Sequence, residues 1–274
     1  MSTTTAADPV PGAGTTRPTT LKRGSFVSDS VAVCTRELLL VFRDPFGLVF
    51  SLLQPLIFLG LFTPLLIGSM PGEDPGDILQ WYLPGVLVMV ALFGTGIVGS
   101  NLQYELMTGS YERVLASPLS RPSLIVGRSV KEMLPLVAQA ALITVIAIPF
   151  GFTLYPAHAV VGLLLLGVFG IGLGALSYSL ALKTRSNEWV FWAVQQSLIF
   201  PLLILSGMML PLEDGPQWLQ TASDFNPLTY IVEAERQLFN GQVGTDALWG
   251  AIAAAVTCAI GLWVGVRTVN RNTV

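Results

Sequence analysis

Residues Glu112–Arg128 read ERVLASPLSRPSLIVGR, a polar and charged stretch that lies between two long apolar runs. A helix that leaves the preceding run over Leu106–Ala116 is expected to end at Ser117–Pro118, because a proline disfavours the helical conformation of the residue before it. Pro122 suits the first turn of a new helix, where its missing N–H needs no partner. The stretch therefore predicts a helix–knuckle–helix that projects from a membrane. The alternative is an ordinary loop that keeps its charges in water.

The composition of the whole chain indicates a membrane protein. Of its 274 residues, 52% are hydrophobic and only 11% are charged. A soluble domain carries about 25% charged residues, so this chain has too few to cover a soluble surface. The sequence also lacks the basic patch that nucleic-acid binding requires.

Six apolar runs without any Asp, Glu, Lys, Arg or His follow one another along the chain. Each is close to the roughly 20 residues that a helix needs to cross a bilayer. The alternating ten-residue segments of a membrane β-barrel are absent. We therefore expect an all-α integral membrane protein whose spans are approximately 47–68, 83–104, 133–152, 159–182, 189–212 and 247–266.

The N-terminal region divides into a tail and a short amphipathic segment. Residues 1–24 are rich in Thr, Pro, Ala and Gly and contain no signal-peptide pattern, which predicts a disordered cytoplasmic tail ahead of a membrane domain over 25–274. Val27–Phe42 is too short and too charged to span, so we expect a helix that lies at the membrane interface. Arg36 and Glu37 within it, and Arg43 just after it, lie among Val and Leu.

The lysines and arginines set the expected orientation. If the N-terminus is inside, 13 of the 14 basic residues lie on the inner side, and only Arg236 lies outside. Basic residues gather on the cytoplasmic side of membrane proteins. Both termini are therefore predicted to be cytoplasmic, in a multi-pass protein of the plasma membrane.

The two cysteines are not expected to form a disulfide, since Cys34 lies on the reducing side and Cys258 lies inside the sixth run. Small residues share a helical face with Cys258 and predict a close helix-packing seam. They are Gly250, Ala254, Gly261 and Gly265, and the fourth run carries a similar set at Gly167, Gly170, Gly174 and Ser177.

The sequence excludes several kinds of chemistry. It contains no GxxxxGK[ST] phosphate loop, and its only histidine, His158, has no nearby cluster of Cys, Asp or Glu that would suggest a metal site. Carriers driven by protons or sodium usually keep ionisable residues inside their spans, although backbone carbonyls can also bind sodium. A chain without such residues is expected to take its energy from a partner.

Three motifs, in order, resemble the permease subunits of the type-2 ABC exporter family, which includes daunorubicin-resistance permeases and polysaccharide exporters. The first is RELLLVFRDPFGLVFSLLQP at Arg36–Pro55, similar to the elbow helix and first span of that family. The second is ERVLASPLSR at Glu112–Arg121. The third lies within Phe200–Arg236 and reads FPLLILSGMMLPLEDGPQWLQ, then NPLTYIVEAER.

The resemblance implies six membrane helices that pair with a second permease, either another copy or a homologue. It also implies two separate ABC subunits that bind ATP and Mg²⁺, so this chain is expected to have no ATP site of its own. The residues expected to transmit the movement are Glu112, Arg113, Ser117, Pro118 and Arg121. Short external helices that partly re-enter the membrane are expected to hold Asn226, Pro227, Tyr230, Glu233, Glu235 and Arg236.

Polar side chains inside the spans are candidates for a substrate path. They are Gln54, Gln139, Gln195 and Gln196. Each amide could contact a substrate or could bond a neighbouring helix. In the family that this chain resembles, the first and fifth spans line the dimer seam. That favours Gln54 and one of the pair Gln195 and Gln196.

Glu235 departs from the apolar residue that is usual at its position in that family. If Leu228–Phe239 is a helix, Glu235 lies in the middle of its apolar face. A carboxylate there must be desolvated, paired or close to water. We expect it to line a wet exit path that favours cationic cargo, and the alternative is a side chain that reaches the outer surface without a role.

The predicted function is ATP-driven export, with this chain as the permease that moves a drug-like or lipid-like amphiphile. An exported polysaccharide or glycolipid precursor remains open. Two alternatives from other classes are an ion-coupled carrier and a membrane scaffold without transport activity.

The predicted orientation can be tested by labelling cysteines. In a cysteine-free variant, a single cysteine at Asp74 or Asp214 should react with a membrane-impermeant thiol reagent in intact cells. A cysteine at Ser120 should react only after permeabilisation. Reversed labelling would contradict the orientation.

Overall fold

The computed structural model describes residues 26–42, 45–69, 74–115, 121–185, 187–212 and 215–271. These residues form α-helices, one 3₁₀ turn and the connections between them, and they contain no strand. The elements in chain order are α1 (Phe26–Phe42), α2 (Pro45–Ser69), α3 (Pro75–Met107), α4 (Ser110–Leu115), α5 (Arg121–Ala147), the turn η1 (Ile148–Phe150), α6 (Pro156–Lys183), α7 (Glu188–Leu205), α8 (Gln217–Asp224), α9 (Pro227–Phe239) and α10 (Thr245–Arg271).

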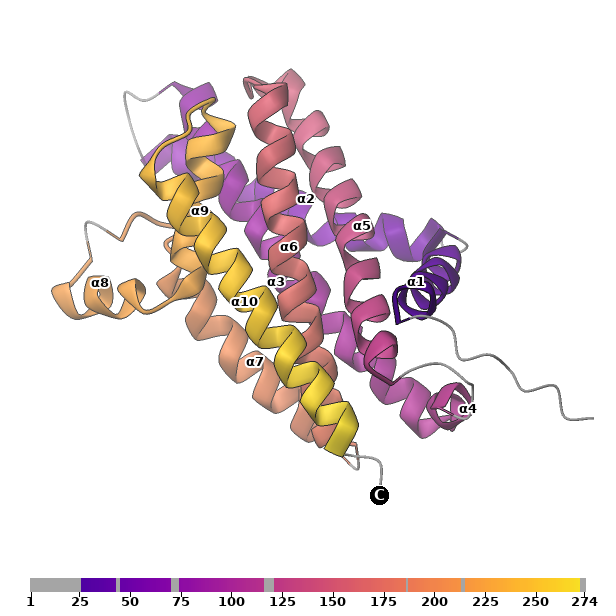
Figure 1. Ribbon diagram of the computed structural model, residues 1–274. Coiled ribbons are helices and arrows are strands. Elements are labelled where there is room, and N and C mark those ends of the chain that lie inside the picture. The colour runs from indigo at the N-terminus through magenta and orange to yellow at the C-terminus, as the bar shows by residue number, and fades with distance from the viewer. Residues whose placement is uncertain are drawn as a thin grey trace, which may run out of the picture.

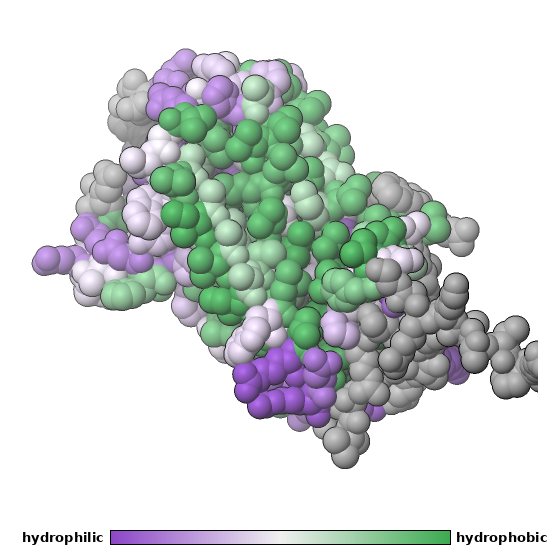
Figure 2. Space-filling view, in the orientation of Figure 1, coloured by the Kyte–Doolittle hydropathy of each residue, from purple (hydrophilic) through white to green (hydrophobic). Residues whose placement is uncertain are grey.

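The expected six membrane helices are confirmed. Within the described residues, six helices are long and apolar enough to cross a membrane, namely α2, α3, α5, α6, α7 and α10. They form one elongated bundle, with α4 and the end of α10 at its lower end and the α9–α10 connection at its upper end (Figure 1). Hydrophobic side chains cover the middle of the face in Figure 2, and hydrophilic residues gather at the lower end of α10 and along the top.

Several helix ends differ from the predicted spans. α3 and α5 begin before their apolar runs, at Pro75 and Arg121, and α5 ends at Ala147, where the 3₁₀ turn η1 follows. The α5 extension carries Arg128 and Lys131, which are buried against other parts of the protein. α7 stops at Leu205 instead of continuing to Leu212, because Gly207 has a φ of 66° and ends the regular helix. α4 does not continue α3 either, because Gly109, with a φ of 68°, separates the two helices.

The seam predicted on the sixth span is confirmed as a set of close helix contacts. A side chain at Gly261 of α10 would collide with the backbone of Gly172 in α6. Gly250 leaves room for Ala234 of α9, and Gly265 leaves room for Ile125 of α5. These contacts bring α10 against α6, α9 and the beginning of α5.

The small residues predicted on the fourth span face other helices. Gly167 and Gly170 of α6 lie against Met133 and Leu136 of α5. Ser177 lies against α3, where its hydroxyl accepts a hydrogen bond of 3.2 Å from the Gly99 N–H. α6 therefore approaches α5 and α3 through the predicted set, and it approaches α10 through Gly172, which that set did not include.

Prolines are distributed unevenly among the six long helices. They occur inside α2, α3, α5 and α7 as Pro55, Pro64, Pro84, Pro135 and Pro201. α10 contains none, and α6 has only Pro156, at its first position, where a proline does not interrupt the helix.

The α6–α10 contact predicts that a methyl group destabilises the protein at Gly261 but not at Gly60, which lies outside the contact. Gly261→Ala should lower the free energy of unfolding by about 1–3 kcal/mol, because overpacking forces backbones apart. Gly60→Ala in α2 is the matched control, since a methyl group there meets no described residue within 4 Å. It should be neutral or slightly stabilising, because alanine favours a helix over glycine. Thermal unfolding in detergent measures both, and equal melting temperatures would contradict the packing role.

Candidate functional site

The predicted helix–knuckle–helix consists of two helices on either side of residues 116–120. α4 precedes these residues and α5 follows them, with Pro122 in the first turn of α5 as expected. Arg113 is exposed on α4. Ser117 and Pro118 lie outside the described residues, as do the side chains of Glu112 and Arg121. The coupling role of these residues stays a prediction.

Arg128 connects three helices at this end of the bundle. Its side chain on α5 is almost completely buried. Its Nη2 donates a hydrogen bond of 2.6 Å to Oε2 of Glu105 on α3. Its Cζ also lies 5.9 Å from the ring centroid of Tyr111 on α4, within the range of a cation–π contact. A displacement of α4 would therefore act directly on α3 and α5.

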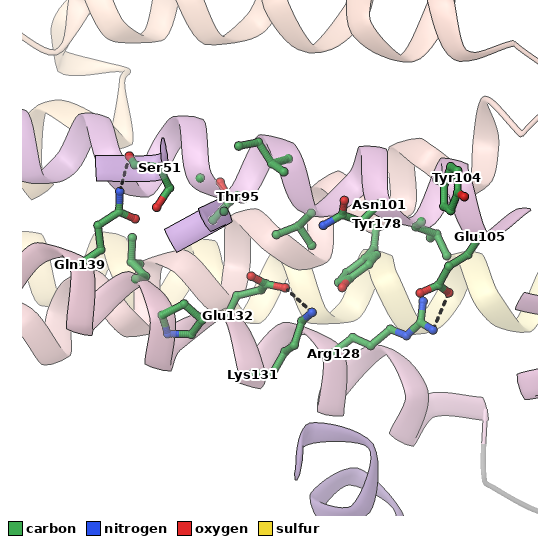
Figure 3. Close-up of a pocket in the computed structure, with 17 residues that line it drawn as sticks. Ser51, Thr95, Asn101, Tyr104, Glu105, Arg128, Lys131, Glu132, Gln139 and Tyr178 are labelled. Carbon is green, nitrogen blue, oxygen red and sulfur yellow. Dashed lines mark hydrogen bonds and ion pairs between the residues drawn. The ribbon is translucent and has the colours of Figure 1, made fainter. Parts of the chain in front are cut away.

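A groove of about 460 Å³ lies beside this ionic contact, and we call it the α3–α5 groove. One end contains the Arg128–Glu105 pair, and the other contains Gln139 and Ser51, with a second ion pair between them (Figure 3). In that second pair, Nζ of Lys131 lies 3.3 Å from Oε1 of Glu132. The residues that line the groove include Ser51, Gly94, Thr95, Asn101, Tyr104, Glu105, Arg128, Lys131, Glu132, Pro135, Gln139 and Tyr178.

The four predicted glutamines occupy different environments. Gln139 donates a hydrogen bond of 2.7 Å to the carbonyl of Ser51 and so links α5 to α2. Gln195 is buried on α7, with its amide against Gly96 of α3. Gln196 is half-buried and Gln54 is exposed on α2. Gln139 and Gln195 thus lie at contacts between helices, and a role for any of the four in a substrate path stays a prediction.

The predicted elbow segment is helical as α1, which packs on the beginning of α5. Gly127 of α5 has no room for a side chain because the Ser30 carbonyl and Val33 of α1 lie against it. The side chains of Arg36 and Glu37 and all of Arg43 lie outside the described residues. The position of α1 at a membrane interface stays a prediction.

The segment between α7 and α10 forms two short helices, as expected. Asn226 begins α9: its Oδ1 accepts a hydrogen bond of 3.1 Å from the Leu228 N–H, while its Nδ2 donates one of 2.8 Å to the Leu202 carbonyl. Pro227 occupies the first helical position. The Tyr230 hydroxyl donates to the Asp224 carbonyl at 2.8 Å and joins α9 to α8. These bonds fix α8 and α9 against the end of α7, and the re-entry of this segment into the membrane stays a prediction.

Arg236 attaches α9 to α3 and to the turn after α7. Its Nε donates to the Trp81 carbonyl at 3.2 Å, and its Nη2 donates to the Gly207 carbonyl at 2.9 Å. Its Cζ lies 3.9 Å from the centroid of the Trp81 ring, which adds a cation–π contact. Burial lowers the pKa of Arg236 to about 10, and the nearby carboxylate of Glu233, which is exposed, opposes that shift.

Glu235 is fully buried, so both of its predicted positions are wrong in this structure. The side chain is 0% exposed and lines neither a wet path nor the outer surface. Its oxygens have no hydrogen-bond partner among the described residues, and Oε2 lies beside Gly162 of α6. Gly162 has no side chain, which leaves space for the carboxyl group on the apolar face of α9. Burial raises the pKa of Glu235 to about 8.

The sequence interpretation missed the groove residues Glu105 and Glu132 and used Arg128 and Lys131 only to set orientation. Arg128, Lys131 and Glu132 lie within about one helical turn of each other at the start of α5. Their spacing of three and four residues was a signal that one helix face carries both charges. The contact of that face with Glu105 depends on how α3 and α5 pack against each other, and the spacing of residues along one helix does not reveal that packing.

Comparison with known proteins gives a consistent result over most of the chain. The family described as ABC-2 type transporter matches residues 30–240. The daunorubicin resistance ABC transporter permease protein DrrB1 of Streptomyces coeruleorubidus is 29% identical over 81% of this chain and 78% of its own length. The probable doxorubicin resistance ABC transporter permease protein DrrC of Mycobacterium tuberculosis is 22% identical over 90% of this chain and 91% of its own. The probable multidrug ABC transporter permease YbhR of Escherichia coli K12 is 26% identical over 65% of this chain and 49% of its own.

The buried Glu235 predicts a pH-dependent contribution to stability. The folded protein holds the carboxyl proton of Glu235 up to about pH 8, whereas the unfolded chain releases it near pH 4.5, the ordinary pKa of a glutamate. The folded state therefore binds more protons between these pH values, and its stability should fall as the pH rises through them. Glu235→Leu should remove this dependence and raise the melting temperature at pH 8 by roughly 2–4 °C per kcal/mol of desolvation relieved.

Thermal unfolding in detergent at pH 5 and pH 8 measures the effect of Glu235. Asp224→Asn is the control, because Asp224 is exposed on the neighbouring α8. That variant should keep the wild-type difference between the two pH values. A Glu235→Leu protein with the same difference would show that Glu235 does not hold its proton in the folded state.

Proposed function

The chain belongs to the ABC-2 type transporter family, and from that membership we propose that it is the permease subunit that moves an amphiphile out of the cell in an ATP-driven exporter. The observation that carries the proposal is the family match over residues 30–240, which includes α2 to α9 and most of α1. ATP and Mg²⁺ would be bound by separate ABC ATPase subunits, and the energy would reach this chain as movement.

The α4 end of the bundle is the proposed docking site for those ATPase subunits. Arg113 is exposed on α4, and Arg128 joins α4 to α3 and α5 through Tyr111 and Glu105. This connection supports a mechanism in which an ATPase subunit displaces α4 and thereby tilts both α3 and α5. The charged side chains at the docking site need not enter the hydrocarbon layer.

The α4 end of the bundle would face the cytoplasm, and the protein would lie in the plasma membrane. Its described basic residues are Arg113, Arg128, Lys131, Lys183, Arg185, Arg267 and Arg271, and the opposite end has Arg236. The positive-inside tendency therefore supports a cytoplasmic α4 and an external α9.

A second copy of the chain, or a homologue, would complete the transport path. Among the six long helices, α2 and α7 are the two with the smallest buried share, so both present apolar surface to a partner. Gln54 is exposed on α2, and Gln196 is half-buried on α7. Apolar helices with a few amides suit an amphiphilic drug-like or lipid-like cargo.

The proposed coupling predicts a specific effect of charge reversal on α4. Arg113→Glu should leave membrane insertion intact but reduce cargo-stimulated ATP hydrolysis by about tenfold when the chain is reconstituted with its ABC ATPase. The reason is that the ATPase surface that fits a cation would meet a like charge, at a cost of about 1–2 kcal/mol. The purified chain alone should hydrolyse no ATP.

Lys183→Glu is the matched control for this experiment. Lys183 is exposed at the same end of the bundle, but it belongs to α6 and not to α4. It should retain most of the wild-type activity. If both variants lose the same ATPase activity, the effect is due to the net charge of this end and not to α4. If Arg113→Glu transports like the wild type, α4 is not in the coupling path.

A further inference from the structure

We propose that the α3–α5 groove binds cationic amphiphiles within a single copy of the chain, ahead of their passage between two copies. The inference rests on the proposed export function and names a loading site for its cargo. The groove volume, about 460 Å³, lies in the range of small-molecule pockets. Its walls combine apolar residues of α3 and α5 with polar groups at both ends (Figure 3).

The ion pairs in the groove expose their acids more than their bases. The Glu105 side chain is 28% accessible, against 4% for its partner Arg128. The Glu132 side chain is 16% accessible, against 11% for Lys131. All four charged side chains line the groove, but Glu105 is the most accessible of them, and each acid is more accessible than its basic partner. That arrangement favours a positively charged group and disfavours a phosphate or carboxylate.

Two further residues suit the same kind of ligand. Tyr104 lines the groove beside Glu105 and is 71% exposed, so its ring is available for a cation–π contact. Gln139 lines the other end, where its amide nitrogen already donates to the Ser51 carbonyl. The groove thus offers acceptors and an aromatic face to a cationic head, and apolar side chains such as Leu136 and Val98 to its body.

Gly94 provides space for the apolar body of the ligand. It lies on α3 and lines the groove, and a Cβ atom added there would meet nothing within 4 Å among the described residues. A leucine at this position would therefore start in open space at the wall of the groove and is large enough to fill part of it. Gly60 on α2 is a matched control, because it also has open space but does not line the groove.

The test measures equilibrium binding of two fluorescent dyes to the full chain in phosphatidylcholine nanodiscs, with empty nanodiscs as the baseline. The dyes are the cationic amphiphile rhodamine 6G and the neutral Nile red. Gly94→Leu should weaken the binding of both by about tenfold, which corresponds to about 1.4 kcal/mol, and Gly60→Leu should change neither. Glu132→Gln should weaken rhodamine 6G by about threefold or more and leave Nile red unchanged.

Unchanged rhodamine 6G binding in a folded Gly94→Leu protein would overturn the site, as would equal effects of Glu132→Gln on the two dyes. The binding assay needs neither ATP nor an ATPase, so it is independent of the export function. If Gly94→Leu binds and exports rhodamine 6G like the wild type, the groove is excluded and export stands. If the groove variants weaken dye binding as expected, but the reconstituted complex transports no dye with ATP, the binding site stands and export is contradicted.

Discussion

The close approach of α6 and α10 is the contact on which the rest of the bundle depends. In a membrane, lipid tails are as apolar as leucine side chains, so helices associate through tight packing and not through escape from water. Gly172 and Gly261 lack the side chains that would separate these two helices. Because α6 also packs against α3, α5 and α9, the backbone contact between two glycines fixes the central helix around which the others are arranged.

Charged residues are subject to a different constraint from the apolar helix faces, because they must either stay outside the hydrocarbon layer or be paired. Arg128 and Glu105 form a pair where the end of α3 meets the beginning of α5, and both line the groove, with Glu105 the more accessible of the two. A buried pair of this kind adds little net stability, but loss of one partner leaves an uncompensated charge. Such a pair is suited to hold α3, α4 and α5 in one relative position.

Sequence patterns predicted the six helices from the length of uncharged apolar runs, and the glycine seam from the spacing of small residues, because both are local features of the chain. The short helices before α10 were expected from the resemblance to the family, which did not give their number. Sequence patterns failed where the outcome depends on long-range packing. The burial of Glu235 requires Gly162, which lies more than 70 residues away in the chain, and the groove requires Glu105 beside Arg128 on another helix. The end of α7 was missed because the apolar run continues past Gly207, where the backbone leaves the helix.

The uneven distribution of prolines separates the long helices into two without an internal proline and four that carry at least one. Each internal proline removes one hydrogen bond and weakens the helix at that point, so bending is concentrated there. α6 and α10 have no such point and are joined through glycines, so they form the stiffer pair, which we call the frame. α2, α3, α5 and α7 each carry a built-in joint, and Pro135 places the joint of α5 in the wall of the groove. A bend at that joint would change the width of the groove while the frame stays still.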